Sequence, residues 1–266
     1  MKTDDSLPAA SGFATPPPIL HGVDAATTLV DVSLVTFAVD PDVLARTLPP
    51  GVRPDVVTLD DGRRRALVSA VSFRDVDFRL AFATRLRFSF LQTNYRAYVR
   101  VGDRRLVWFF GTTLDSPLVA VPRLAWQMPW HRDVMRLGAA WDGERCRDYR
   151  LSTRGSWGGA DVALEGTDER VGRLDGFADA DETLLVLTHP LDGMYRRRDG
   201  GLGGYSVWHE RFAPRLGIAR TARYDVFERL GLVEPGAAPH SVMLQRTIDF
   251  AVLLPPIRLP EEPVGR

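Results

Sequence analysis

The chain has 266 residues, of which 45% are hydrophobic and 26% charged, and its formal net charge is zero. This composition is ordinary for a globular protein with a sizeable buried core. Without a basic excess the chain has no general attraction for nucleic acid or an anionic membrane, and no run of about 18 apolar residues could span a bilayer. Residues 1–5 also lack the apolar stretch of a signal peptide. We therefore expect a cytoplasmic protein that binds neither nucleic acid nor membrane.

Two scarce residue types restrict the chemistry. Lys2 is the only lysine, against 33 arginines. A Schiff base needs a primary amine that can lose its proton, and a guanidinium cannot replace it. An internal lysine imine is therefore excluded. Cys146 is the only cysteine, so an internal disulfide is impossible, and we interpret this thiol as incidental rather than nucleophilic.

The domain organisation follows from composition along the chain. Residues 1–18 are small, polar and rich in proline, which predicts a disordered leader. Residues 19–259 contain no linker, repeat or low-complexity stretch and are predicted to form one domain. Residues 260–266 are predicted to form a short tail.

Taken in chain order, the hydrophobic pattern predicts mostly strands. Residues 27–37 alternate, as in a half-buried strand. Asp40 and Pro41 form an N-cap and first-turn pair, and this helix is expected to stop at Leu48-Pro49-Pro50-Gly51. Later strands are predicted over residues 56–59, 65–73, 88–101, 106–114, 145–152, 161–165, 205–213, 221–227 and 246–254. Helices are predicted from Ser116 to about Trp126 and over residues 179–187. Many antiparallel strands with few short helices indicate an α+β, mainly antiparallel β fold of barrel type.

The predicted hairpin of residues 88–101 and 106–114 places a row of polar side chains on one face. Side chains alternate along a strand, so odd positions of residues 91–101, which are largely apolar, belong against a core. The even positions carry Phe88, Phe90, Gln92, Asn94, Arg96, Tyr98 and Arg100. This face either meets solvent or lines a cavity, and the partner stretch 106–110, apolar on both faces, favours the cavity. A two-residue turn at Gly102-Asp103 would place Asn94 opposite Gly111.

Five segments follow one another in a recognisable order. They are Pro16-Pro17-Pro18; Val39-Asp40-Pro41 with Leu48-Pro49-Pro50-Gly51; Phe90-Leu91-Gln92-Thr93-Asn94-Tyr95-Arg96-Ala97-Tyr98-Val99; Val107-Trp108-Phe109-Phe110 through to Met128-Pro129-Trp130-His131; and Val207-Trp208-His209-Glu210-Arg211-Phe212. Together they resemble the acetoacetate-decarboxylase-like superfamily and, within it, the YqjF-like family. The likeness runs from about Pro16 to Leu259. It implies a closed β-barrel or cone with a central cavity and a few short helices, and, because members of the superfamily often assemble, a homo-oligomer.

The same resemblance counts against decarboxylation. In acetoacetate decarboxylases the corresponding segment ends in Phe-Pro-Lys-Lys, and the first lysine forms the imine. Here the stretch reads Met128-Pro129-Trp130-His131, and a carboxylate of the decarboxylase site corresponds to Gln92. The resemblance therefore implies the fold and the cavity without the imine chemistry.

His131 is the first candidate for proton transfer, because an imidazole titrates near neutral pH; the alternative is a structural histidine at a strand end. Arg96 and Asn94 are the candidates for holding a carboxylate or enolate oxygen, and an internal salt bridge is the alternative for Arg96. The expected substrate-binding residues are Gln92, Tyr98, Arg123, Trp130, Phe90 and His209. For Arg123 we favour an ion pair with Asp115 or Glu210.

Other motifs offer no site. The histidines His21, His131, His189, His209 and His240 show no metal-ligand spacing, so neither a metal nor another cofactor is expected. The glycine-rich stretch 200–204 lacks the lysine of a phosphate loop and is interpreted as a turn.

The leading functional hypothesis is an enzyme that performs acid–base chemistry on a keto or enol metabolite. Isomerisation, cyclisation, dehydration and lyase reactions all fit this description. The alternative is a carrier or sensor that binds a small molecule in the same cavity without converting it.

Overall fold

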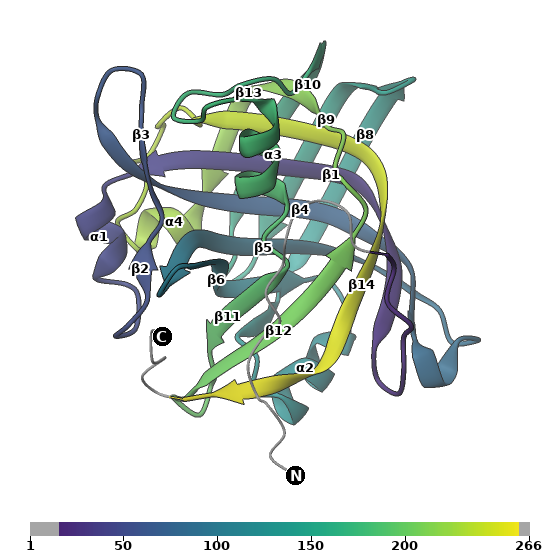
Figure 1. Ribbon diagram of the computed structural model, residues 1–266. Coiled ribbons are helices and arrows are strands. Elements are labelled where there is room, and N and C mark those ends of the chain that lie inside the picture. The colour runs from purple at the N-terminus through teal and green to yellow at the C-terminus, as the bar shows by residue number, and fades with distance from the viewer. Residues whose placement is uncertain (1–15, 261–266) are drawn as a thin grey trace.

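The computed structural model describes residues 16–260. The predicted leader and tail therefore lie outside the described residues, except for residues 16–18 and 260. Strands make up most of the described chain, joined by short helices (Figure 1). None of these helices has the length and apolar character needed to cross a membrane.

The strands are β1 (Ala25–Val39), β2 (Arg53–Pro54), β3 (Val56–Thr58), β4 (Arg64–Leu80), β5 (Phe88–Val101), β6 (Arg104–Leu114), β7 (Trp130–Arg132), β8 (Val134–Asp142), β9 (Arg145–Arg154), β10 (Ala160–Arg170), β11 (Asp192–Arg196), β12 (Leu202–His209), β13 (Arg215–Tyr224) and β14 (Ser241–Leu259). The α-helices are α1 (Pro41–Ala45), α2 (Ala120–Ala125), α3 (Ala180–Thr188) and α4 (Asp225–Arg229), and the 3-10 turns are η1 (Ala81–Ala83) and η2 (Pro117–Val119).

Seven strands close into a barrel in the order β1-β4-β5-β6-β11-β12-β14, and β14 pairs back to β1. The neighbours β6 and β11 are parallel, and the other pairs in the ring are antiparallel. Closure depends on the length of β14, whose 19 residues pair with β1 over the first part and with β12 over the last. A closed ring satisfies the backbone hydrogen bonds of its strands without an open edge.

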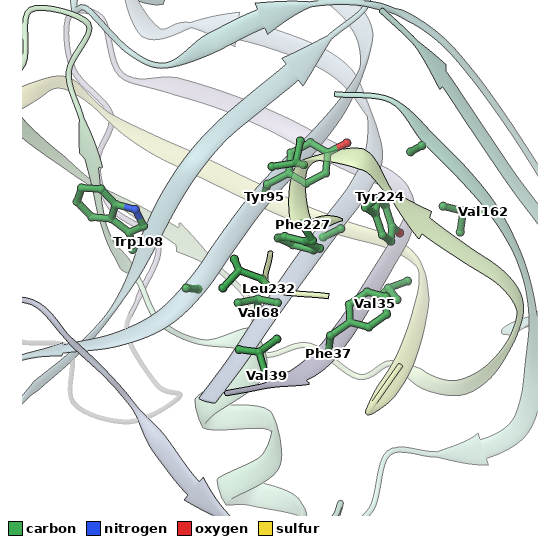
Figure 2. Packing of buried hydrophobic residues seen from close by; sticks show 14 of the residues in the cluster. Val35, Phe37, Val39, Val68, Tyr95, Trp108, Val162, Tyr224, Phe227 and Leu232 are labelled. Atoms are coloured by element: carbon green, nitrogen blue, oxygen red, sulfur yellow. The ribbon is translucent and has the colours of Figure 1, made fainter. Parts of the chain in front are cut away.

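The sheet continues past β14 as β13-β10-β9-β8, and this extension packs on the outside of the barrel. The apolar cluster between the two layers contains Phe37 of β1, Tyr95 of β5 and Val162 of β10, with Phe227 of α4 among them (Figure 2). Phe227 is fully buried, and its ring meets those of Phe37 and Tyr95 edge-on at centroid distances of 6.1 and 5.7 Å. Buried aromatic surface of this kind is a main source of stability.

A second apolar cluster lies inside the barrel. Leu34 of β1, Val71 of β4 and Phe109 of β6 belong to it, and α3 adds Leu184 and Leu187. The barrel strands are thus apolar on both faces, one face against the outer layer and one toward the interior.

The predicted mainly antiparallel barrel with few short helices is confirmed. The predicted caps are confirmed too, since Asp40 Oδ1 accepts from the backbone N–H groups of Asp42 and Val43 at 2.8 and 3.2 Å. Ser116 Oγ accepts from the N–H of Leu118 at 3.2 Å at the start of η2.

Two parts of the secondary-structure prediction are wrong. The strand expected over residues 221–227 ends at Tyr224, because α4 begins at Asp225 and turns Val226 and Phe227 into the core. Strands β2, β7, β8 and β11 have no counterpart among the predicted strands. Among the inward positions of β8 only Met135 is buried, and one of its exposed positions carries the apolar Val134, so its hydrophobic pattern is weak.

The hairpin register also differs from the prediction by one residue. From the turn up to Arg96, which faces Phe109, the pairing is as expected, but Tyr95 then faces Gly111. One residue of β6, Phe110, is therefore extra, which is a β-bulge. As a result Asn94 lies opposite Thr112 instead of Gly111.

Candidate functional site

The barrel encloses a cavity of about 200 Å³. On β5 the side chains of Phe88, Phe90, Gln92, Asn94 and Arg96 line it, whereas the odd positions of the same strand belong to the outer core. The remaining walls come from β1, β4, β6, β11, β12 and β14, from the segment around α2 and from the end of α3 with the residues after it. The face of β5 predicted to line a cavity does so from Phe88 to Arg96, whereas Tyr98 and Arg100 on the same face do not line it. A space of this size suits a small metabolite.

Arg96 is the only arginine among the described residues that line the cavity. Its Nη2 donates to the carbonyl of Leu187 at 2.9 Å and to the Tyr98 hydroxyl at 3.4 Å. Leu187 is in the last turn of α3, where the exposed carbonyls carry partial negative charge. Within residues 16–260, Arg96 Nε has no hydrogen-bond partner and no carboxylate forms an ion pair with the side chain. The internal salt bridge considered for Arg96 is therefore wrong.

A pair of amides lies next to Arg96 on the same face of β5. Gln92 Nε2 donates to Asn94 Oδ1 at 2.9 Å, and Thr112 Oγ1 donates to the same oxygen at 2.8 Å. With its oxygen engaged twice, the Asn94 amide keeps its Nδ2 to donate to an oxygen of a ligand. The β-bulge that moves Thr112 opposite Asn94 is what creates this contact.

Trp130 and His131 are adjacent on β7 and point to opposite faces. Trp130 lines the cavity, whereas the His131 ring stacks on Trp157 with centroids 4.0 Å apart and planes 4° apart. Burial, together with the nearby charge of Arg123, lowers the pKa of His131 to about 4. The structure thus places His131 outside the cavity, which corrects its expected position, because neighbouring residues of a strand alternate.

Tyr98 and Arg123 were also expected to contact substrate, and neither lines the cavity. The buried Tyr98 hydroxyl donates to the Leu187 carbonyl at 2.8 Å and so helps to fix the end of α3 beside Arg96. Arg123 Nη1 donates to the backbone carbonyl of Trp130 at 2.9 Å. The expected Arg123 ion pair with Asp115 or Glu210 is not formed; Asp115 Oδ1 instead accepts from the N–H of Leu91.

His209 supplies an imidazole to the cavity. It is buried and lines the cavity, and its ring stacks on Phe250 with centroids 5.1 Å apart. Nδ1 donates to the Glu210 carbonyl at 2.7 Å, and the His189 ring meets it edge-on at 5.0 Å. Burial, with smaller contributions from the charges of His189 and Arg96, lowers the pKa of His209 to about 4. The imidazole is therefore neutral at neutral pH.

Asp75 is a cavity residue that the sequence did not identify. It follows Val71 and Phe73 on the inward face of β4, is 4% exposed and lines the cavity. Thr27 Oγ1 donates to its Oδ1 at 3.0 Å, and Oδ2 has no partner within the described part of the chain. Burial raises the pKa of Asp75 to about 7. The alternation of Val71, Phe73 and Asp75 along β4 could have indicated this position, but the predicted strand ends at Phe73.

Among residues 16–260, no three His, Cys, Asp or Glu side chains come together as they would around a metal ion. The glycine-rich stretch 200–204 forms the turn between β11 and β12 and the first residues of β12, as predicted.

Comparison with known proteins gives a family match and a shared fold. The family model DUF2071, described as "Uncharacterized conserved protein (COG2071)", matches residues 26–249, and no curated protein matches the sequence. The solved structure of the enduracididine biosynthesis enzyme MppR with HEPES buffer bound has a TM-score of 0.55 at 18% identity, covering 94% of this chain and 91% of that one. An acetoacetate decarboxylase from Legionella pneumophila has a TM-score of 0.54 at 12% identity, covering 96% and 98%.

An acetoacetate decarboxylase-like enzyme from Sphingomonas wittichii RW1 has a TM-score of 0.54 at 13% identity, covering 95% of this chain and 99% of that one. At identities this low, the similarity establishes a shared fold and nothing about the reaction. The acetoacetate-decarboxylase-like fold expected from the sequence is thereby confirmed.

Proposed function

This chain belongs to the DUF2071 family, and we propose that it is a small-molecule enzyme that acts on a keto acid or its enol inside the barrel. The reaction proceeds by proton transfer and charge stabilisation, without a lysine imine, since residues 3–266 contain no lysine. Enolisation is the step that isomerisation, cyclisation, dehydration and lyase reactions of such a metabolite have in common.

The observation that carries this proposal is the uncompensated guanidinium of Arg96. A buried charge is normally paired, because desolvation without a partner is costly. Arg96 lines an apolar cavity and has only neutral acceptors, the Leu187 carbonyl and the Tyr98 hydroxyl. An anionic oxygen of a substrate would complete the pair by charge-assisted hydrogen bonds.

Asn94 and His209 supply the remaining parts. The Asn94 Nδ2 donates to the oxygen on which negative charge develops when a proton leaves the neighbouring carbon. His209, which is neutral at neutral pH, accepts that proton, and the bound anion favours its protonation by attracting the imidazolium. This role replaces the one expected for His131.

One of the similar structures supports a keto acid as substrate. MppR has been solved in complex with pyruvate and with the condensation product of pyruvate and imidazole 4-carboxaldehyde. The fold therefore accommodates a keto acid in that protein, at 17% identity to this chain.

A proton-exchange measurement tests the proposal. In deuterated buffer, the enzyme is expected to speed the exchange of the methyl protons of pyruvate and of the benzylic protons of phenylpyruvate, followed by proton NMR. Arg96→Met removes the charge and is expected to slow exchange by roughly a hundredfold, a loss typical of one oxyanion-stabilising group. The matched control Arg136→Met lies on the exposed face of β8 and leaves exchange unchanged.

A carrier or sensor is the second candidate, favoured by Trp130, which lines the cavity at the position where decarboxylases have their reactive lysine. Saturable binding of both keto acids, with proton exchange no faster than in buffer, would support the carrier and contradict the enzyme. Binding that Arg96→Met leaves unchanged contradicts both.

A further inference from the structure

The buried aspartates of this protein differ in how their charge is compensated. Asp55 forms ion pairs with Arg100 and Arg105 at N–O distances of 2.6 and 2.8 Å, and Asp192 forms one with Arg104 at 2.7 Å. Two more buried aspartates follow a different pattern. Asp133 Oδ2 accepts from the backbone N–H of Gly158 at 2.8 Å. Asp75 Oδ1 accepts from the hydroxyl of Thr27. Neither an arginine nor a histidine among residues 16–260 pairs with Asp75.

Asp75 lines the cavity, and one of its two carboxyl oxygens is buried and unpaired. Thr27 Oγ1 binds Oδ1 and also lies 3.2 Å from the carbonyl of Val76, so the hydroxyl is anchored to β4 on both sides. This contact holds the carboxyl group in one orientation and leaves Oδ2 without a partner in the described residues. The surrounding wall is apolar, with Leu29, Phe73 and Phe90 among the lining residues. The ionised form of Asp75 is costly in such a place unless a counter-charge accompanies it.

We propose that Asp75 forms a second subsite that takes the cationic nitrogen of a ligand whose anionic group lies on Arg96. The cavity would then recognise a zwitterion, a carboxylate with an ammonium or guanidinium group at the far end of its chain. The two uncompensated charges have opposite sign and line one cavity, which is the electrostatic complement of such a molecule. The anionic half of this ligand rests on the proposed function of Arg96, whereas the cationic half rests on Asp75 alone.

The register of the barrel fixes how far apart the two ligand charges lie. Asp75 of β4 is opposite Phe90 of β5, and Arg96 is six positions further along β5. Six residues of strand span roughly 20 Å, of which the two side chains bridge only a part. The charges of an α-amino acid are too close together to reach both groups. The ligand therefore carries its cation at the end of an extended chain, which the apolar wall between the two subsites covers.

Calorimetric binding at about pH 8.5 tests the subsite. The probes are ω-amino carboxylates of increasing length, from γ-aminobutyrate to ω-aminododecanoate, each compared with the carboxylate that lacks the amine. One length is expected to bind roughly tenfold more tightly than its amine-free partner, as one charge-assisted contact would give. Asp75→Asn is expected to remove this advantage and to leave the affinity of the amine-free carboxylate unchanged. An advantage that survives Asp75→Asn, or none at any length, overturns the proposal.

Two further arms separate this inference from the proposed function. Simple alkylamines, butylamine to octylamine, report on Asp75 alone, and their binding is expected to be lost in Asp75→Asn and retained in Arg96→Met. If the alkylamines bind in this way while carboxylates do not bind at all, the function proposed for Arg96 fails and the cationic subsite stands. Asp77→Asn is the matched control, because it removes the same charge two residues along β4 from a side chain that does not line the cavity. Loss of amine binding in Asp77→Asn as large as in Asp75→Asn contradicts the subsite.

Discussion

At the scale of single residues, the polar groups of the cavity keep their charge or lose it according to what surrounds them. The Arg96 guanidinium has neutral acceptors only, the Leu187 carbonyl at the end of α3 and the Tyr98 hydroxyl. Asp75 is desolvated without a cation, and burial raises its pKa to about 7, while burial lowers the pKa of His209 to about 4. Near neutral pH the cavity therefore holds the Arg96 cation, the neutral His209 imidazole and the partly ionised Asp75 carboxyl group, besides Asp192, which is paired with Arg104.

Asp75→Asn is expected to change the pH dependence of stability. The folded-state pKa of Asp75 is about 7 against a model value of 3.8, so its neutral form is favoured in the folded protein. The contribution of Asp75 to the free energy of unfolding of the wild type is fully present below about pH 4 and is lost as the pH rises through about 7. The loss amounts to about 4 kcal/mol at most. Asparagine stays neutral throughout. The free energy of unfolding of the variant, measured with urea, should therefore rise relative to that of the wild type over this pH range. A difference that does not vary with pH would contradict the buried, unpaired carboxyl group.

His209 is expected to report on the ligand. A carboxylate bound at Arg96 cancels part of the positive charge that helps to lower the pKa of His209, so this pKa should rise when pyruvate binds. Proton NMR titration of the ring resonances measures the change. His131 serves as an internal control, because it stacks on Trp157 outside the cavity and its pKa should not respond. Equal shifts of both histidines would indicate an effect of salt or of unfolding.

The sequence predicted part of this site and missed part of it for identifiable reasons. The alternation of β5 correctly placed Gln92, Asn94 and Arg96 on the cavity side, because period-2 geometry follows from the backbone alone. It could not decide between Trp130 and His131, since a strand of three residues has no pattern from which to read its inward face. Asp75 was missed because the apolar stretch that marks β4 ends two residues before it.

At the scale of elements, β-bulges and glycines set which side chains meet. The bulge at Phe110 sets Gly111 opposite Tyr95 and Thr112 opposite Asn94. A Cβ on Gly111 would lie 2.5 Å from the ring of Trp157 and 2.8 Å from the carbonyl oxygen of Pro129. The glycine therefore allows the loop with Trp157 to close over β6. Sequence patterns predict strands well but not an extra residue within a strand, because a bulge leaves the composition unchanged.

Gly111→Ala is expected to destabilise the protein by about 1–3 kcal/mol, the usual range for overpacking, because one of the two neighbours is backbone and cannot rotate away. Thermal or urea unfolding measures the loss. Gly138→Ala on β8 is the matched control, since a Cβ there meets no atom within 4 Å. Similar losses for both substitutions would mean that strand propensity, and not the close contact, explains the effect.

At the scale of the whole molecule, two separate apolar clusters have different positions: one joins the two layers and the other surrounds the cavity. The cluster around Phe227 joins the barrel to the outer layer, and the cluster with Leu34 and Phe109 surrounds the cavity. The sequence, helped by the family resemblance, predicted a closed barrel with a cavity. It did not predict the outer layer as a unit, because β8 is exposed on alternate residues and one of these, Val134, is apolar, which obscures the alternation.

Phe227→Ala is expected to lower the free energy of unfolding by about 3–5 kcal/mol, since it removes a fully buried ring from an aromatic cluster. Because this ring belongs to the outer cluster, the affinity of the folded variant for a ligand of the cavity should stay within about twofold of wild type. Urea unfolding and calorimetry measure the two quantities separately. A loss of affinity parallel to the loss of stability would contradict the division into two clusters.

The pairing of β1 with β14 joins the first strand of the barrel, drawn in purple, to the last, drawn in yellow (Figure 1). Thr28 Oγ1 and Asp249 Oδ1, 2.8 Å apart, are separated by 221 positions in the chain. During synthesis β1 therefore has no partner on this side until β14 has emerged from the ribosome, and the cavity lacks the β14 wall until then. Contacts between such distant positions slow folding and expose unpaired strand edges to other chains in the meantime. Truncation by a premature stop before β14 would accordingly yield an aggregating polypeptide in place of a smaller working barrel.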